Sequence, residues 1–133
     1  MSKNDNISNS LLKLNKCIEL GRKEVELYPA SSLLVNIFDL LKEKGFIGSY
    51  DLEETSRGNK ITVNLIGKIN KIKSIKPRFP VSLNGDNDYE SFERRYLLAK
   101  DFGLLLVSTS KGLMSHIDAK DKNLGGRLIA YCY

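Results

Sequence analysis

The sequence has few of the residues on which metal, redox and histidine chemistry depend. Its 133 residues include two cysteines, one histidine and no tryptophan. Cys17 and Cys132 are far apart and form no Cys-x-x-Cys pair, so a zinc site or a disulfide framework has too few ligands. His116 alone gives poor support for acid–base chemistry built on histidines. We therefore expect two reduced thiols, no metal and no cofactor.

Long apolar runs are also missing. No stretch approaches the roughly 20 apolar residues that a membrane-spanning helix needs. The first ten residues, MSKNDNISNS, lack the apolar core of a secretory signal, and they contain an acid but no arginine, unlike a transit peptide. We expect a chain that works in the compartment where it is made and has no membrane partner.

Positive charge is in excess, and the excess lies in the second half. Residues 1–66 carry nine basic and nine acidic side chains, whereas residues 67–133 carry twelve basic and seven acidic ones. The net charge of +5 therefore belongs to the second half. This asymmetry predicts that the second half meets an anionic partner.

The hydrophobic periodicity of the first half predicts a helix–strand–helix–hairpin unit. Apolar residues recur at helical spacing over 7–18 and 31–45; Gly21 and Gly45 end these segments, and Ser31 or Ser32 can cap the second. Short alternating runs predict strands at 24–28, 46–54 and 60–67. Helices and antiparallel strands in this order indicate an α+β layer structure.

A basic segment separates the two halves. Residues 68–78 contain five cations and no acid, and the prolines at 77 and 80 exclude a continuous helix. We predict an N-terminal α+β half at 1–67, a basic linker at 68–78 and a C-terminal half at 79–133 that meets the anionic partner.

The second half is predicted to be mostly β with a short helix. Strands are expected at 78–83, 103–108 and 127–133, and a helix at 88–100 with Asp86 or Asp88 as a cap near its start. Alternation in the last strand predicts Leu128, Ala130 and Cys132 on one face. Gly125 and Gly126 precede that strand, where a tight turn or a close backbone approach requires glycine.

The sequence STSKG at 108–112 follows a buried apolar run and is the densest group of hydrogen-bonding side chains. Three interpretations are open: a polar hairpin turn, a Ser110–Lys111 enzyme, or a surface for a polyanion. The phosphate-loop frame is missing, and adjacent side chains in an extended segment point apart, which argues against a nucleophile–base pair. Together with the basic linker, the motif favours contact with RNA phosphates and ribose hydroxyls.

Three segments resemble the universal small-subunit ribosomal protein eight family. The C-terminal sequence DFGLLLVSTSKGLMSHIDAKDKNLGGRLIAYCY is similar to the end of that family, where STSKG precedes a Gly-Gly turn and a final strand. YPASSLLVNIFDLLKEKGFI and SIKPRFPV resemble its N-terminal segment and its linker. The resemblance therefore covers nearly the whole chain.

The resemblance implies a non-enzymatic constituent of the small ribosomal subunit that supports assembly and translation. It implies binding to the central domain of small-subunit rRNA through the C-terminal half, and packing on RNA and neighbouring ribosomal proteins through the N-terminal half. No small-molecule substrate is implied. The RNA contacts carried over are Ser108, Thr109, Ser110, Lys111 and Gly112, with Gly125 and Gly126 shaping the adjacent turn and Ser74, Lys76 and Arg78 as further candidates in the linker.

The chain also departs from the family pattern. Arg127 follows the paired glycines where family members usually have Glu, so this position is expected to meet phosphate. Mitochondrial members of the family are resembled by three stretches, RFP, FERRYLLAKDFG and the final AYCY. Lysine also outnumbers arginine, by 15 to 6. We expect a mitochondrial ribosome and an organelle-encoded chain, with a bacterial or plastid ribosome as the alternative. A free-standing RNA-binding translational regulator and a small Ser/Lys enzyme also stay open.

Overall fold

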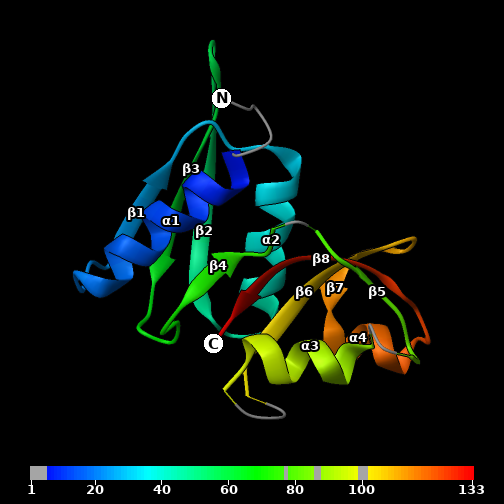
Figure 1. Ribbon diagram of the computed structural model, residues 1–133. Helices are drawn as coiled ribbons and strands as arrows, with labels where there is room; N and C mark the ends of the chain where they lie inside the picture. Colours follow the sequence, from blue (N-terminus) through cyan, green and yellow to red (C-terminus); the bar gives the residue numbers. More distant parts are fainter. Residues whose placement is uncertain (1–5, 77, 86–87, 99–101) are drawn as a thin grey trace. The chain divides into compact units, whose positions relative to one another are not determined.

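The computed structural model describes residues 6–76, 78–85, 88–98 and 102–133 (Figure 1). The chain forms two compact units, Met1–Ile72 and Lys73–Tyr133. The described residues include helices and antiparallel sheets, which confirms the α+β class. None of the described helices is both long and apolar enough to cross a bilayer. The boundaries drawn from the sequence, with a linker at 68–78, stay a prediction.

The first unit has the predicted order of elements. These are α1 (Asn6–Glu19), β1 (Glu24–Leu27), α2 (Ser32–Glu43), β2 (Ile47–Thr55) and β3 (Gly58–Leu65). The three strands form an antiparallel sheet in the order β1-β3-β2. α2 begins where expected, because the Ser31 side chain accepts a hydrogen bond from the backbone N–H of Leu34 at 3.2 Å.

The sheet of the first unit has one buried and one exposed face. Alternation along β1 and β3 buries Val25, Leu27, Ile61 and Val63 on a common face, while α1 contacts β1 and α2 contacts β2. On the opposite face, Lys60 Nζ lies 3.1 Å from Glu53 Oε1 and 4.0 Å from Glu26 Oε2. The hydrogen bond to Glu53 raises the pKa of Lys60.

The second unit surrounds one strand, β8 (Gly126–Cys132). Its sheet has the order β4-β8-β6-β7, and β5 also pairs with β8. The other elements are β4 (Ile72–Ser74), β5 (Pro80–Val81), α3 (Tyr89–Tyr96), β6 (Leu104–Thr109), β7 (Gly112–Ser115) and α4 (His116–Asp121).

Three of these elements, β4, β7 and α4, were not predicted because each is too short to show its own periodicity. α3 begins at its predicted cap, since Asp88 Oδ1 accepts from the N–H of Ser91 at 3.0 Å. The alternative cap, Asp86, lies outside the described residues. The helix ends at Tyr96 rather than extending to 100. The strand predicted at 78–83 is reduced to two residues.

The predicted alternation of the last strand is wrong at Leu128, which does not share a face with Ala130 and Cys132. The register of the β6–β8 ladder shifts between Leu106, which is opposite Ala130, and Val107, which is opposite Leu128. Ile129 is thus an extra residue, a β-bulge. As a result Leu128 and Tyr131, three residues apart, both pack on the core cluster of the second unit.

Candidate nucleic-acid interface

A two-residue hairpin turn joins β6 to β7 in the second unit. Thr109 and Gly112 form the last pair of the ladder, so Ser110 and Lys111 stand at the tip. Thr109 Oγ1 donates to the carbonyl oxygen of Gly112 (2.8 Å) and accepts from the backbone N–H of Lys111 (3.1 Å). Gly112 has φ = +110°, which favours glycine. The Thr109 hydroxyl thereby stabilises the backbone of the turn, and the side chains of Ser110 and Lys111 are exposed.

The paired glycines allow strands to approach closely beside this turn. A Cβ on Gly126 would lie 2.2 Å from the carbonyl oxygen of Ser108 on β6. A Cβ on Gly125 would lie 2.8 Å from the carbonyl oxygen of Val81 on β5. Of the two roles considered for these glycines, the structure therefore shows close backbone approach.

Arg127 connects the basic segment to the turn. Within the sheet it is opposite Ser108 of β6 on one side and Pro80 of β5 on the other. Its Nη1 donates to the carbonyl oxygen of Arg78 at 3.2 Å, although Arg78 is 49 residues earlier in the chain. Both arginine side chains are exposed. Strand pairing thus places Arg127 opposite the serine that begins the STSKG motif, and the hydrogen bond from Arg127 holds the backbone of Arg78 on its other side.

Ser74 and Lys76 lie further along the same edge of β8. The N–H of Ile75 between them donates to the carbonyl oxygen of Ile129 at 2.9 Å. Lys76 is exposed and Ser74 is half-buried. Lys73 is exposed on the same strand and was not among the predicted contact residues. The signal that could have identified it is the Lys-Ile-Lys alternation at 71–73, which places both lysines on the face opposite the buried Ile72.

The second unit therefore presents hydroxyls and cations on connected strands. Short hydroxyl side chains can approach phosphate oxygens and ribose hydroxyls closely, and lysine and arginine add charge. The predicted contact residues that are exposed are Ser108, Ser110, Lys111, Gly112, Lys76, Arg78, Gly125 and Arg127, whereas Thr109, Gly126 and Ser74 are half-buried. This arrangement suits a sugar–phosphate backbone.

The only histidine is part of the core. His116 is fully buried, and its Nδ1 accepts a hydrogen bond from the N–H of Leu105 at 3.1 Å. Its Nε2 lies 3.9 Å from Glu93 Oε1, to which Lys120 Nζ donates at 2.7 Å. His116 is therefore a buried core residue, whereas Ser110 and Lys111 of the turn are exposed.

The two cysteines differ in environment. Cys132 is buried in β8, and burial raises the pKa of its thiol to about 12. Cys17 is half-buried and unpaired by any disulfide. Across the described part of the chain, no group of three or more His, Cys, Asp or Glu side chains could hold a metal ion.

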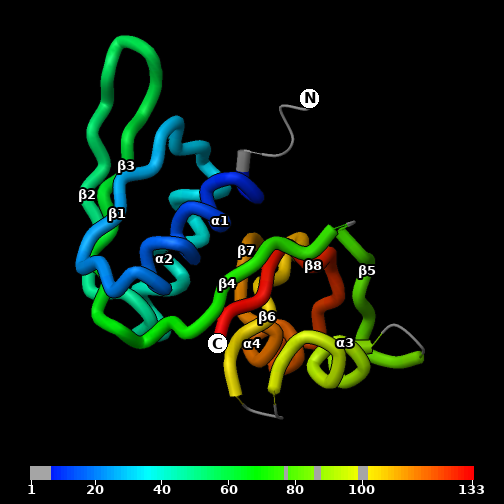
Figure 2. The backbone as a smooth tube through the Cα atoms, turned by 60° about the vertical axis from the view of Figure 1, so that its left-hand side comes forward, coloured from blue at the N-terminus to red at the C-terminus, as the bar shows by residue number. Residues whose placement is uncertain are grey.

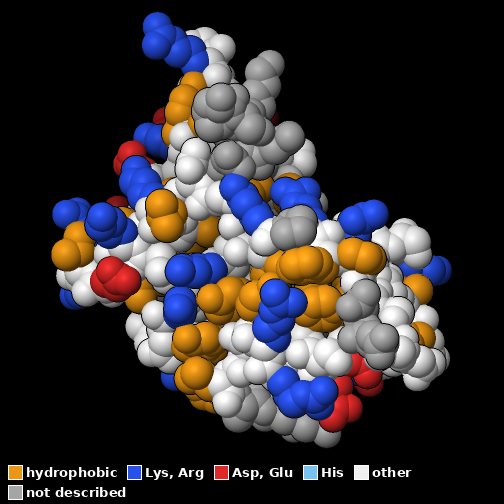
Figure 3. All heavy atoms as spheres, in the orientation of Figure 1, with side chains coloured by type: hydrophobic (Ala, Val, Ile, Leu, Met, Phe, Trp, Pro, Cys, Tyr) orange, Lys and Arg blue, Asp and Glu red, His pale blue; other side chains and the backbone are white. Residues whose placement is uncertain are grey.

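A row of aromatic rings lies between α3 and β8. Phe92 stacks on Phe79 and Tyr96 at centroid distances of 5.9 and 6.3 Å, and Tyr96 stacks on Tyr131 at 5.2 Å. The guanidinium of Arg95 lies over Phe79 at 5.2 Å. Hydrophobic side chains between basic ones are visible on this side of the unit in Figure 3. Most of these rings pack on the core cluster, so they stabilise the unit.

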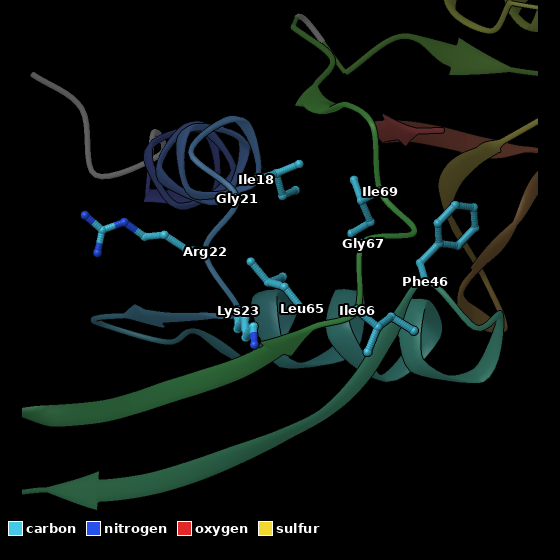
Figure 4. Close-up of a pocket in the computed structure, with 9 residues that line it drawn as sticks. All are labelled: Ile18, Gly21, Arg22, Lys23, Phe46, Leu65, Ile66, Gly67 and Ile69. Carbon is cyan, nitrogen blue, oxygen red and sulfur yellow. The ribbon is translucent and has the colours of Figure 1, made fainter.

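A hollow of about 350 Å³ lies in the first unit, near the ends of α1 and β3 (Figure 4). Its lining is mostly apolar and includes Ile18, Phe46 and Leu65. The only charged lining residues are Arg22 and Lys23, and the Arg22 side chain is directed away from Phe46 (Figure 4). The lining has no carboxylate, thiol, imidazole or side-chain hydroxyl, so it brings together no acid–base pair.

The family model for ribosomal protein S8 matches residues 5–133 of the chain. The match includes both units, the β6–β7 turn and the paired glycines. It confirms the resemblance to the small-subunit protein eight family, while the likeness to mitochondrial members stays a prediction.

Proposed function

This chain belongs to the ribosomal protein S8 family, and from that membership we propose that it binds the central domain of small-subunit rRNA and supports subunit assembly. The family consists of structural ribosomal proteins, not enzymes. The chain is accordingly a small-subunit ribosomal protein that binds rRNA and other ribosomal proteins, and it acts in the ribosome.

The observation that carries the proposal is the junction between the STSKG turn and Arg127. Lys111 at the tip and Arg127 beside Ser108 are both exposed, and each can neutralise a phosphate. Attraction by these cations is followed by short-range contacts from the hydroxyls of Ser108 and Ser110. Because the Thr109 side chain already holds the turn backbone, binding requires little ordering of this loop.

The linker residues Ser74, Lys76 and Arg78 extend this contact along β8. Residues 1–66, whose charges balance, support packing on RNA and on neighbouring ribosomal proteins. For the location we propose a mitochondrial ribosome and an organelle-encoded chain, which the lysine excess and the likeness of the FERRYLLAKDFG stretch support. Fractionation that recovers the chain in bacterial or plastid ribosomes instead would contradict the proposed location.

The test is a titration against a central-domain fragment of small-subunit rRNA at several salt concentrations, with an unrelated duplex of equal length as competitor. Lys111→Ala should weaken binding and reduce the slope of log affinity against log salt by about 0.9, the value for one phosphate contact. Ser110→Ala should cost about 1 kcal/mol of binding free energy, one hydrogen bond, without changing the slope.

Lys42→Ala is the matched control, because it removes one exposed cation from α2 of the first unit. It should leave affinity and salt slope close to those of the unmodified chain. Equal slopes for the Lys111 and Ser110 variants would refute the division of roles. Equal binding to the rRNA fragment and the unrelated duplex would refute specific recognition, and failure to co-sediment with small subunits would favour a free-standing regulator.

A further inference from the structure

The turn between β2 and β3 repeats the sequence pattern of the β6–β7 turn. It reads Thr-Ser-Arg-Gly over 55–58, and the β6–β7 turn reads Thr-Ser-Lys-Gly over 109–112. In each turn the threonine and the glycine form the last pair of an antiparallel ladder. The serine and the cation are therefore the two tip residues in both hairpins.

The threonine hydroxyl makes the same two hydrogen bonds in both turns. Thr55 Oγ1 donates to the carbonyl oxygen of Gly58 and accepts from the N–H of Arg57 at 3.3 Å, as Thr109 does in the β6–β7 turn. Gly58 has φ = +131°, in the same left-handed region as the glycine of the other turn. The two turns thus have the same chemistry and the same backbone design.

Two contacts from the end of β1 hold the backbone of the 55–58 turn. Tyr28 Oη donates to the carbonyl oxygen of Arg57 at 2.6 Å, and the N–H of Ala30 donates to the carbonyl oxygen of Asn59 at 2.7 Å. The hairpin extends beyond the last β1–β3 pair, as Figure 2 shows. Its tip is consequently held in place before any ligand binds, which lowers the entropic cost of binding there.

The charges along the hairpin favour binding of an anionic ligand at its tip. Ser56 and Arg57 are exposed, and basic side-chain atoms stand at the far end of the hairpin in Figure 3. Behind the tip, Glu53 is engaged by Lys60 and Glu54 is exposed. The exposed carboxylate of Glu54 repels a polyanion from the shaft, which favours contact at the end of the hairpin.

We propose that the 55–58 turn is a second contact to the RNA backbone, with Arg57 at a phosphate and the Ser56 hydroxyl at a phosphate or ribose oxygen. A guanidinium suits this position because it can bond two phosphate oxygens at once. The inference rests on the proposed function, since it assigns to the first unit the chemistry proposed for the β6–β7 turn.

The experiment is a titration of the full chain against complete small-subunit rRNA between about 50 and 200 mM salt. Over this range one phosphate contact accounts for about a threefold change in affinity. Arg57→Ala should therefore show a roughly threefold smaller fall in affinity than the unmodified chain. Arg57→Lys, which retains the charge, should restore the salt dependence, a result that a purely structural role of the side chain would not produce.

Lys42→Ala serves as the charge-matched control, and Lys111→Ala reports on the β6–β7 turn in the same titration. Urea unfolding of the Arg57 variants should match that of the unmodified chain, because the side chain is exposed. An unchanged salt slope for Arg57→Ala, alongside a flattened slope for Lys111→Ala, would overturn this inference and leave the proposed function intact. If the unmodified chain binds an unrelated duplex of equal length equally tightly, the result would refute both this inference and the proposed function.

Discussion

Replacement of Gly126 by alanine tests whether the turn and Arg127 form one surface. The added Cβ would lie 2.2 Å from the carbonyl oxygen of Ser108 and 3.1 Å from Val107 Cγ1. Real Cβ contacts are essentially never shorter than 3.0 Å, so β6 and β8 must separate by about 0.8 Å, the difference between 3.0 and 2.2 Å. The clashing atom belongs to the backbone, and no side chain can rotate to relieve the contact.

Overpacking of this kind costs about 1–3 kcal/mol of unfolding free energy. Urea unfolding followed by circular dichroism measures that loss. The same separation moves Arg127 away from Ser108, so we also expect weaker RNA binding at a temperature where the variant is still folded. The titration with the central-domain rRNA fragment measures this second effect independently of stability.

Gly125→Ala is the matched control, because its Cβ would lie 2.8 Å from the carbonyl oxygen of Val81 and requires a shift of only about 0.2 Å. It should lose less stability and less RNA affinity than Gly126→Ala. The reasoning would be refuted if Gly126→Ala unfolded at the same urea concentration as the unmodified chain and bound RNA equally well. It would also be refuted if the two glycine variants were indistinguishable.

Two further predictions concern buried groups of the chain. Tyr89→Phe should lower the unfolding free energy by about 1–2 kcal/mol, because the carbonyl oxygen of Leu124 loses the hydrogen bond that Tyr89 Oη donates at 2.7 Å. The RNA affinity of the folded chain should not change. An unchanged urea midpoint would contradict this prediction. A thiol reagent at neutral pH should modify half-buried Cys17 but not Cys132, whose burial raises the pKa of its thiol to about 12. Unfolding in urea should make both thiols reactive, and equal rates in the native state would contradict the burial of Cys132.

The first unit could be predicted well because its signals are local. The helical spacing of apolar residues and a serine cap identify α2, and alternation identifies β1 and β3. Each signal comes from residues within a few positions of one another. The order helix–strand–helix–hairpin followed from them directly.

The second unit was less predictable because its short elements depend on distant partners. The three residues of β4 form a strand in a sheet with β8, and Ile75 just beyond β4 finds its hydrogen-bond partner at Ile129. The bulge in β8 arises from its register with β6, which the sequence of β8 alone does not reveal. Local propensity is too weak in segments of this length to decide their structure.

For the candidate site too, some features follow from the sequence and others only from the tertiary structure. The sequence alone determined the dense group of hydrogen-bonding side chains at 108–112 and a net positive second half, since both depend on residues adjacent in the chain or on composition. Only the tertiary structure brought Ser108 opposite Arg127 and the guanidinium of Arg127 onto the carbonyl of Arg78. Those neighbours were decided by which strands pair and in which register, and strand pairing is a property of segments that are far apart in the chain.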